Sequence, residues 1–522
     1  MGTIVDALKQ LQSGSMMAAW YAFKAQKRSR KWDADNLSRF LSCTMDEARS
    51  RAATDFATNT LSLQLLDETT VFRELVMRRE VGGDTEFSGQ RDHSAHTVNN
   101  WLLGWLIFET SDPFRKSFSR AVDARRLRTA KTPDESAALE HVFGDVWMFA
   151  SLLHDIGYLF EGAIGPTSWQ SHHEMARRAI SVVRGHQQHQ VWSAWGLSSL
   201  VDQNIAKLSV PSWFRSNPGN DTLVSILDEL KTLGDLRLLF KDLSSTWSGI
   251  DRDFSEKAEN APTSFSSESR ERLREQTDAF DLWKLHYSSF TSGTTQSAML
   301  RHVENVRQAT YALAVDGLPG LGLRLIDHGV AGGLILLQIN TLFFAAHQAL
   351  KEARPRDWDQ SKQWLAFRGD ALGATFKNEF WWAGIVWACF ATAFHNVQQL
   401  LKSTKSKHSL PKTGRFCHVE LSPLRLDDDP LAYLGVLVDI VQEWDRYAVV
   451  RAGHLFGKRS LQGSEVTVTY ETDGRLRLNL GERATDAIEA LDAALEDWQS
   501  LLVLEGGASK TSRGDGRGPA NA

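Results

Sequence analysis

A histidine-aspartate doublet at the end of an apolar run is the part of the sequence best suited to chemistry. Residues 149–162 read FASLLHDIGYLFEG, in which His154 and Asp155 are followed by Gly157. Neighbouring side chains on a helix point about 100° apart, so both members of the doublet can reach one metal ion only where the helix ends or bends. Gly157 provides a point at which the helix can end. The structural alternative is a chance doublet that caps a helix.

A carboxylate in a second apolar segment also requires a partner. Asp439 lies in residues 431–446, LAYLGVLVDIVQEWDR, whose apolar residues recur at helical spacing. An unpaired carboxylate is costly to bury, so Asp439 needs a metal ion or a base beside it. On a continuous helix, Gln442, Glu443 and Arg446 share its face.

Taken in order, these segments resemble the HD-domain superfamily of metal-dependent phosphohydrolases. Besides H-D-I-G, the resemblance rests on RDHSAHTV at 91–98 and on a closing D-x-x-x-x-W-x-R element at 439–446. Residues 327–336, DHGVAGGLIL, are similar to the H-x-x-G-x-x-L element of two-metal members. Residues 391–396, ATAFHN, resemble a further ligand position of the family. The resemblance implies a mainly α fold built around an HD-domain helical bundle.

The resemblance also implies a set of metal ligands. They are His96, His154, Asp155, His328, His395 and Asp439. The first three and the last would hold one divalent ion, whereas His328 and His395 would add a second, bridged by Asp155. Imidazoles and carboxylates without thiolates favour Mn, Fe, Ni, Co or Zn and disfavour a pure Mg site. Two such ions about 3.5–4 Å apart can hold a hydroxide nucleophile and clamp a phosphoryl group.

The catalytic roles implied by the resemblance centre on His154 and Asp155, because the metal they hold activates the water. Arg446 is expected to contact the substrate phosphate, with a salt bridge to a nearby carboxylate as the alternative. Asp327 or Glu161 is a candidate for orienting the water or taking its proton, with helix capping as the alternative. The lysine that often follows H-D-x-G in catalytic members is replaced here by Tyr158.

Other histidines compete for places in the set. His93, three residues before His96, is the alternative first ligand or a capping group. His172 and His173, in SWQSHHE, are alternatives for the extra ligand and could instead bind phosphate or transfer protons. For His328 and His395, the structural alternative is a core histidine that bonds a backbone carbonyl.

Composition excludes several classes of protein. The formal net charge of −5 and the pI of about 6.4 exclude a globally basic nucleic-acid coat protein. With 42% hydrophobic and 24% charged residues, wholesale disorder is excluded, and only 12 prolines in 522 residues favour long helices. The three cysteines are far apart and form no CxxC pair, which argues against a disulfide framework and a thiolate zinc site. Reduced thiols and the lack of a visible targeting segment predict a cytoplasmic protein.

Two apolar stretches, residues 330–346 and 381–394, raise the question of a membrane span. The first is interrupted by Gln338 and Asn340, and the second has only 14 residues. Both fall short of the roughly 20 apolar residues that a spanning helix needs. We therefore predict buried core helices at both places.

The chain is expected to divide into six segments. They are an N-terminal helical region at 1–85, a first part of the HD core at 86–165, a large and partly flexible helical insertion at 166–320, a second part of the core at 321–450, a small C-terminal β-hairpin plus helix at 451–505, and a disordered tail at 506–522. The hairpin is predicted from EVTVTY and RLRLNL on either side of an Asp-Gly turn, and the helix from an amphipathic pattern at about 484–504.

The resulting hypothesis is a metal-dependent phosphohydrolase that cleaves a phosphate ester of a nucleotide or a related small molecule. One alternative is a phosphodiesterase for cyclic nucleotides or nucleic acid. A nuclease should have a basic channel lined with aromatic residues. Trp101, Trp105, Trp147 and Trp387, however, recur at core spacing and are expected to pack in the interior. A non-catalytic HD module that binds a nucleotide or a partner protein is the other alternative.

Overall fold

The structure is a computed structural model and describes part of the chain. The described residues are 2–27, 34–43, 46–61, 93–128, 135–159, 279–311, 327–330, 332–333, 336–337, 380–396, 422–445 and 461–506. Most of them are helical, which agrees with a mainly α fold. Of the insertion predicted at 166–320, only residues 279–311 are described, and the predicted tail lies outside the description beyond Gly506.

Helices that are buried on every side form the centre of the molecule. α6 (His93–Thr110) packs against α8 (Glu135–Leu152), and both contact α22 (Pro430–Val441). α20 (Val386–Phe394), which follows a π-helical turn η6 (Trp381–Ile385), packs against α8 and α22 and is buried at every residue. A helix with apolar side chains on all faces has to be covered by neighbours on all sides.

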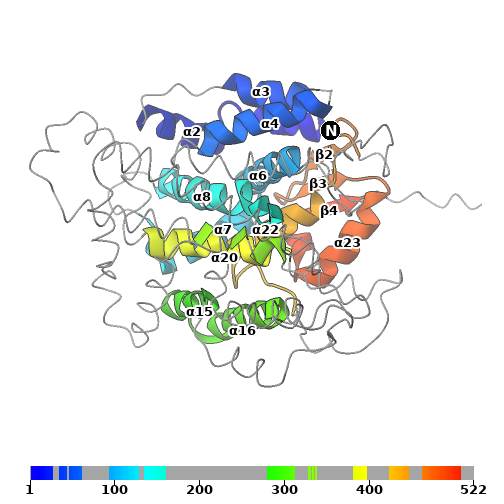
Figure 1. Cartoon of the computed structure of the whole chain (residues 1–522). Helices are drawn as coiled ribbons and strands as arrows, with labels where there is room; N and C mark the ends of the chain where they lie inside the picture. The colour runs from blue at the N-terminus through cyan, green and yellow to red at the C-terminus, as the bar shows by residue number, and fades with distance from the viewer. Residues whose placement is uncertain are drawn as a thin grey trace, which may run out of the picture.

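Other helices cover this core in layers, as Figure 1 shows. They are α1 (Ile4–Gln10), α2 (Met16–Lys27), α3 (Ala34–Ser42), α4 (Asp46–Leu61), α7 (Asp112–Ala124), α15 (Ala279–Phe290), α16 (Gly293–Tyr311) and α23 (Arg483–Ala494). The N-terminal helices α2 and α4 contact α8 and α6, while α15 contacts α20 on the opposite side of the core.

Tryptophans fill the space between the central helices. Trp101, Trp105, Trp147 and Trp387 are fully buried, which confirms that their spacing reflects core packing. The Trp147 indole N–H donates to the backbone oxygen of Trp101 at 3.0 Å, so one polar atom of this aromatic core is satisfied across α6 and α8. Burial of large aromatic side chains contributes strongly to the stability of a core.

Polar residues just ahead of three helices define where those helices begin. Thr3 and Asp6 form a capping box at α1, each side chain accepting a bond from the other residue's backbone N–H at 3.2 Å. Ser111 caps α7 and Asp429 caps α22, and a proline follows each of them in the first turn. Proline is favoured there because its missing N–H would have no helical partner.

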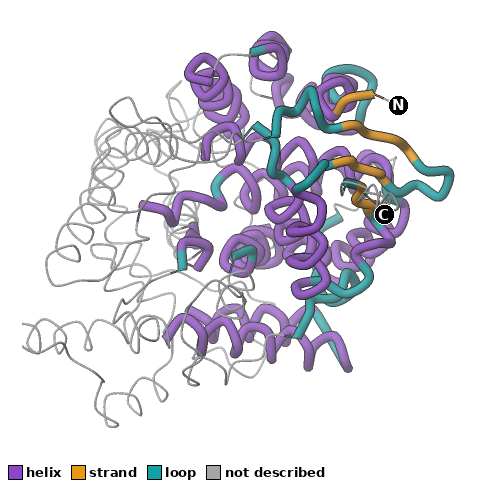
Figure 2. The backbone as a smooth tube through the Cα atoms, turned by 90° about the vertical axis from the view of Figure 1, so that its right-hand side faces the viewer, coloured by secondary structure: helices purple, strands orange, loops and turns teal. Residues whose placement is uncertain are grey.

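Within the described ranges, the strands form one four-stranded sheet at the side of the helices (Figure 2). The predicted hairpin is confirmed as β2 (Thr467–Tyr470) and β3 (Leu476–Asn479), with Gly474 at φ 84° in the turn. β1 (Gly2–Thr3) adds antiparallel to β2, so the N-terminal region is not purely helical as predicted.

The predicted C-terminal helix at 484–504 is wrong in its second half. α23 ends at Ala494, a short 3₁₀ turn η8 (Trp498–Ser500) follows, and β4 (Leu502–Glu505) pairs parallel to β3. The apolar run at 501–504 is compatible with either a buried helix or a buried strand. Pairing with β3 decides between them, and the chain leaves the helix through Asp497 at φ 53°.

A second correction concerns the segment around Asp439. α22 ends at Val441 instead of continuing through the segment 431–446, and Gln442 already has a non-helical ψ of 84°. Glu443 therefore does not follow Asp439 on a helical face, and Arg446 lies outside the described residues. Because α22 ends early, the Gln442 side chain reaches His96 on α6.

Glycines allow three backbone segments to meet beside the doublet. A Cβ on Gly157 would overlap the backbone oxygen of His328, and one on Gly332 would lie 2.9 Å from the backbone oxygen of His154. A Cβ on Gly333 would lie 2.5 Å from the backbone oxygen of Cys389 on α20. Gly332 and Gly333 therefore permit the close approach of these segments.

No helix in the described ranges is long and apolar enough to cross a membrane. This agrees with the prediction for residues 381–394, which are buried from Ala383 through His395. Of the other apolar stretch, 330–346, only Val330, residues 332–333 and residues 336–337 are described, and those are buried.

We predict that Gly157→Ala destabilises the protein by about 1–3 kcal/mol, because the added methyl group forces backbones apart in a packed region. Thermal unfolding followed by circular dichroism measures the effect. Gly435→Ala is the matched control, since its Cβ would meet no atom closer than 3.8 Å and alanine is favoured within helix α22. Equal melting temperatures for the two variants would contradict the proposed close approach.

Candidate metal centre

The structure brings all six predicted ligands together from five segments of the chain. They are His96 on α6, His154 and Asp155 in the 3₁₀ helix η2 (His154–Leu159), His328 in the helical turn at 327–330, His395 at the end of α20, and Asp439 on α22. Five of the six residues are at most 5% exposed, and the Asp439 side chain is 12% exposed. Such a concentration of imidazoles and carboxylates in the interior is unusual unless the groups are paired or hold a metal ion.

The ligand atoms form three overlapping groups, each with atoms within 4.8 Å of one another. The groups are His96 with His154 and Asp155, His154 with His395 and Asp439, and Asp155 with His328 and His395. Because three residues each belong to two groups, the six side chains form one continuous cluster. Within it, His96 Nε2 lies 2.8 Å from Asp439 Oδ1.

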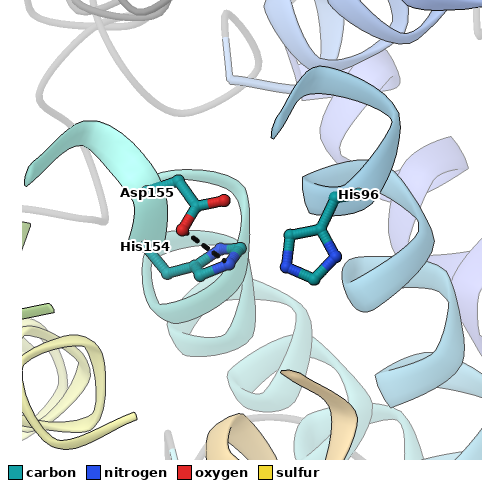
Figure 3. A group of neighbouring side chains, drawn as sticks. All are labelled: His96, His154 and Asp155. Carbon is teal, nitrogen blue, oxygen red and sulfur yellow. Dashed lines mark ion pairs between the residues drawn. The ribbon is translucent and has the colours of Figure 1, made fainter. Parts of the chain in front are cut away.

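The doublet converges because α8 ends directly before it. The helix stops at Leu152, and the chain continues from His154 as η2, so the two side chains no longer point along one regular helix. Figure 3 shows His154 and Asp155 at this turn, with His154 Nε2 3.1 Å from Asp155 Oδ1, and His96 facing them from α6. The sequence-based expectation that the doublet converges at a helix end is therefore confirmed.

Backbone carbonyls orient two of the histidines. The ring atom Nδ1 of His395 lies 2.6 Å from the oxygen of Thr392, and Nδ1 of His154 bonds the oxygen of Ser151, in each case three residues earlier. A proton on Nδ1 leaves a lone pair on Nε2, the tautomer needed for metal binding through that atom. The Nε2 atom of His395 is buried and has no hydrogen-bond partner in the part of the chain that the structure describes.

This arrangement unites the two interpretations of His395. Its Nδ1 bonds a carbonyl, as a core histidine would, while its Nε2 lies among the other ligand atoms. A buried nitrogen without a partner is costly unless something outside the chain binds it. The donor types and this nitrogen both fit a metal ion.

Gln442 orients a third histidine from the other side. Its amide nitrogen donates to the Trp444 carbonyl, so its Oε1 faces Nδ1 of His96 and accepts from it. Nε2 of His96 thereby faces the cluster, 2.8 Å from Asp439 Oδ1. Such supporting hydrogen bonds hold metal-binding histidines in the required tautomer and orientation.

Burial and charge shift the pKa values of the cluster in opposite directions. Burial raises the pKa of Asp439, but hydrogen bonds from His154 and His96 outweigh it and hold that pKa well below its usual value. Burial lowers the pKa of His154, yet the charges of Asp155 and Asp439 raise it above the ordinary histidine value. Burial, with the neighbouring His154, lowers the pKa of His395 to about 3, which keeps His395 neutral.

Asp327 has a structural place next to the cluster. Its Oδ1 accepts from the Val330 N–H at 3.0 Å, as a helix cap does, and its Oδ2 accepts from the Asn396 amide at 2.5 Å. The same amide nitrogen lies 3.3 Å from Nδ1 of His328. These contacts agree with the capping alternative for Asp327 and place Asn396 beside a predicted ligand.

Several predicted alternatives lie outside the described structure. These are Glu161, His172, His173 and Arg446, together with the side chains of His93 and Tyr158. Their roles remain sequence-based predictions.

Sequence reasoning missed Asn100, included Asn396 only as part of the motif at 391–396, and did not foresee how Gln442 acts. Asn100 Nδ2 lies 3.1 Å from His96 Nε2 and 3.4 Å from Asp439 Oδ1. The available signal was its position four residues after His96, which places both side chains on one face of α6. No local pattern indicates that Gln442 reaches back to His96, 346 positions away.

We predict that Gln442→Met weakens metal binding by about 10–100-fold, because His96 loses the acceptor that directs its Nε2 at the cluster. Gln442→Glu retains an acceptor for His96 but loses the bond donated to the Trp444 carbonyl, so a smaller loss of affinity than in Gln442→Met is expected. Calorimetric titration with Mn²⁺ measures both affinities. Equal losses in the two variants would show that the packing of Gln442 matters and its acceptor does not.

We also predict that metal binding releases about one proton at a pH below the raised pKa of His154. Below that pKa the imidazole is protonated between two carboxylates in the absence of a metal ion, and a ligating histidine must be neutral. Apparent affinity should therefore rise as the pH increases through that pKa and level off above it. Calorimetry in two buffers of different ionisation enthalpy counts the released protons. A count of zero at a pH below the pKa of His154 would contradict the assignment.

Comparison of the chain with protein-family models, curated proteins and solved structures finds no match. The interpretation of the site consequently rests on its own geometry and chemistry.

Proposed function

We propose that this chain is a metal-dependent phosphohydrolase of the HD-domain type, which cleaves a phosphate ester of a nucleotide or a related small molecule. The observation that carries the proposal is the convergence of six buried histidines and aspartates, in the order expected of that family. The residues span 343 positions, from His96 to Asp439, yet their ligand atoms form three overlapping groups, each with atoms within 4.8 Å of one another. Convergence over such a separation is hard to attribute to local sequence bias.

The cluster offers enough ligands for two divalent ions. His96, His154, Asp155 and Asp439 suit one ion, and His328 and His395, with Asp155 shared, suit a second. This donor set favours Mn, Fe, Co, Ni or Zn over Mg. Bound divalent ions supply Lewis acidity toward a phosphoryl oxygen and lower the pKa of water by several units.

The charge of the cluster supports an anionic substrate. Its histidines are neutral when they ligate, so the protein contributes two negative charges through Asp155 and Asp439. A single divalent ion would neutralise these charges, whereas two would leave a surplus of two positive charges. A surplus of this sign in a buried site attracts a phosphate group strongly, because the local dielectric constant is low.

The residues of the chain itself orient the cluster and hold its protons. The Ser151 and Thr392 carbonyls and the Gln442 amide keep Nδ1 of three histidines protonated, which leaves each Nε2 available. Asp327 is poorly suited to act as a base, because both of its oxygens accept hydrogen bonds.

The aromatic residues favour a small substrate over nucleic acid. Four tryptophans that could have lined a nucleic-acid channel are fully buried: Trp101, Trp105, Trp147 and Trp387. Base stacking on aromatic rings requires exposed faces. A phosphorylated small molecule or nucleotide therefore remains the preferred substrate class.

We predict two transition-metal ions per chain after purification without chelator, together with Mn²⁺-dependent release of phosphate from a nucleotide panel. Asp155→Ala or His154→Ala should abolish both metal loading and hydrolysis, because both residues belong to the ligand set of the first ion and Asp155 is also shared with the second. His328→Ala and His395→Ala should reduce bound metal from about two ions to one. Elemental analysis and a phosphate-release assay measure these outcomes.

His141→Ala is the matched control, since His141 lies on α8 but stacks on Phe23, away from the cluster. It should retain the metal content and activity of the parent chain. Full activity in Asp155→Ala, or a parent chain without metal and without Mn²⁺-dependent activity, would overturn the proposal.

A further inference from the structure

The Asn100 amide lies within the ligand cluster. Its Nδ2 atom is 3.1 Å from His96 Nε2, 3.4 Å from Asp439 Oδ1 and 3.5 Å from His154 Nε2. The residue is 1% exposed, so water cannot readily replace it.

These distances match the spacing of ligands around one ion. With metal–ligand bonds of roughly 2.0–2.1 Å, neighbouring ligand atoms lie about 2.9–3.4 Å apart. The end of the Asn100 amide lies within this range of His96 Nε2 and Asp439 Oδ1, and its 3.5 Å distance from His154 Nε2 is just above the range.

The two ends of the amide have very different surroundings. Nδ2 has the contacts given above, whereas Oδ1 is buried and has no hydrogen-bond partner in the described ranges. An unsatisfied buried carbonyl oxygen costs roughly 1–3 kcal/mol. Rotation by half a turn about the Cβ–Cγ bond exchanges the two amide atoms without a change in volume. Because Oδ1 accepts no hydrogen bond in the described ranges, none is lost at that atom.

An N–H group directed at His96 Nε2 and Asp439 Oδ1 competes for the lone pairs that a metal ion needs. An amide oxygen in the same position adds a lone pair instead, and amide oxygens are established ligands of hard divalent ions. We propose that Asn100 is a further metal ligand, through Oδ1, of the ion held by His96, His154 and Asp439. This inference rests on the metal site of the proposed function and adds a neutral oxygen ligand to it.

A carbonyl ligand has a consequence for metal preference. Oxygen ligands and higher coordination numbers suit Mn²⁺, whereas Zn²⁺ favours four ligands rich in nitrogen and sulfur. Asn100 is thus expected to shift the site toward Mn²⁺ relative to Zn²⁺.

Titration with Co²⁺, followed by visible absorption, tests the assignment without a substrate. Asn100→Leu should weaken Co²⁺ binding by about 10–100-fold and intensify the absorption, as a lower coordination number does. Asn100→Asp retains an oxygen at this position and should keep the affinity and the spectrum of the parent chain. Asn100→Leu should also weaken Mn²⁺ binding more than Zn²⁺ binding.

Asn99→Leu is the matched control. Asn99 is the preceding residue of α6, is fully buried, and neither of its amide atoms has a hydrogen-bond partner among the described residues. Adjacent helical residues point about 100° apart, so this variant should bind Co²⁺ as the parent does. Circular dichroism checks folding, and Asn100→Ala takes the place of Asn100→Leu if that variant is unfolded.

Two results would overturn the inference while leaving the proposed function intact. One is an Asn100→Leu variant with the affinity and spectrum of the parent chain. The other is an Asn100→Asp variant whose spectrum matches Asn100→Leu, which would make Asn100 only a hydrogen-bond donor to Asp439. Conversely, the expected Co²⁺ results in a chain that hydrolyses no phosphate ester would support the ligand and refute the proposed function. A parent chain that binds no Co²⁺ would overturn both.

Discussion

The carboxylate of Asp439, which is only 12% exposed, constrains how the central helices pack. It lies on a helix whose other residues are almost all apolar and buried, and an isolated charge in such surroundings would be expelled or neutralised. His96 and His154 keep it ionised, as its lowered pKa indicates. Those contacts require α6, the end of α8 and α22 to keep one mutual position, so the packing of three central helices is tied to a single charge.

The ends of helices are used repeatedly to prepare this site. The last carbonyls of a helix have no partner within it, and those of Ser151 and Thr392 bond the histidines that follow. The early end of α22 has the same effect by another route, because Gln442 leaves the helix and reaches His96. Groups that helix termini leave unsatisfied thus become the orienting contacts of the cluster.

The outer layers hold this arrangement in place. Asp445, three residues after Gln442, forms a buried ion pair with Arg49 of α4 at 2.5 Å and accepts from the Gly463 N–H at 3.0 Å. The N-terminal helices and the segment that leads into the sheet therefore both anchor the turn that carries Gln442. On the other side of the core, Asp429 caps α22 and accepts from the indole of Trp387 on α20. Buried polar contacts of this kind specify one packing arrangement when every partner is satisfied.

The sequence by itself determined the helical character of the core, the position of the doublet at a helix end, the β2–β3 hairpin and the residue types of the cluster. Those features depend on local periodicity, turn residues and the cost of burying Asp439, which neighbouring residues reveal. Only the tertiary structure decided that six side chains from five segments meet, that Gln442 and Asn100 join them, and that residues 502–505 form a strand. Helical periodicity gives the buried face of each helix but not its rotation or its partner, because both arise from contacts between residues hundreds of positions apart.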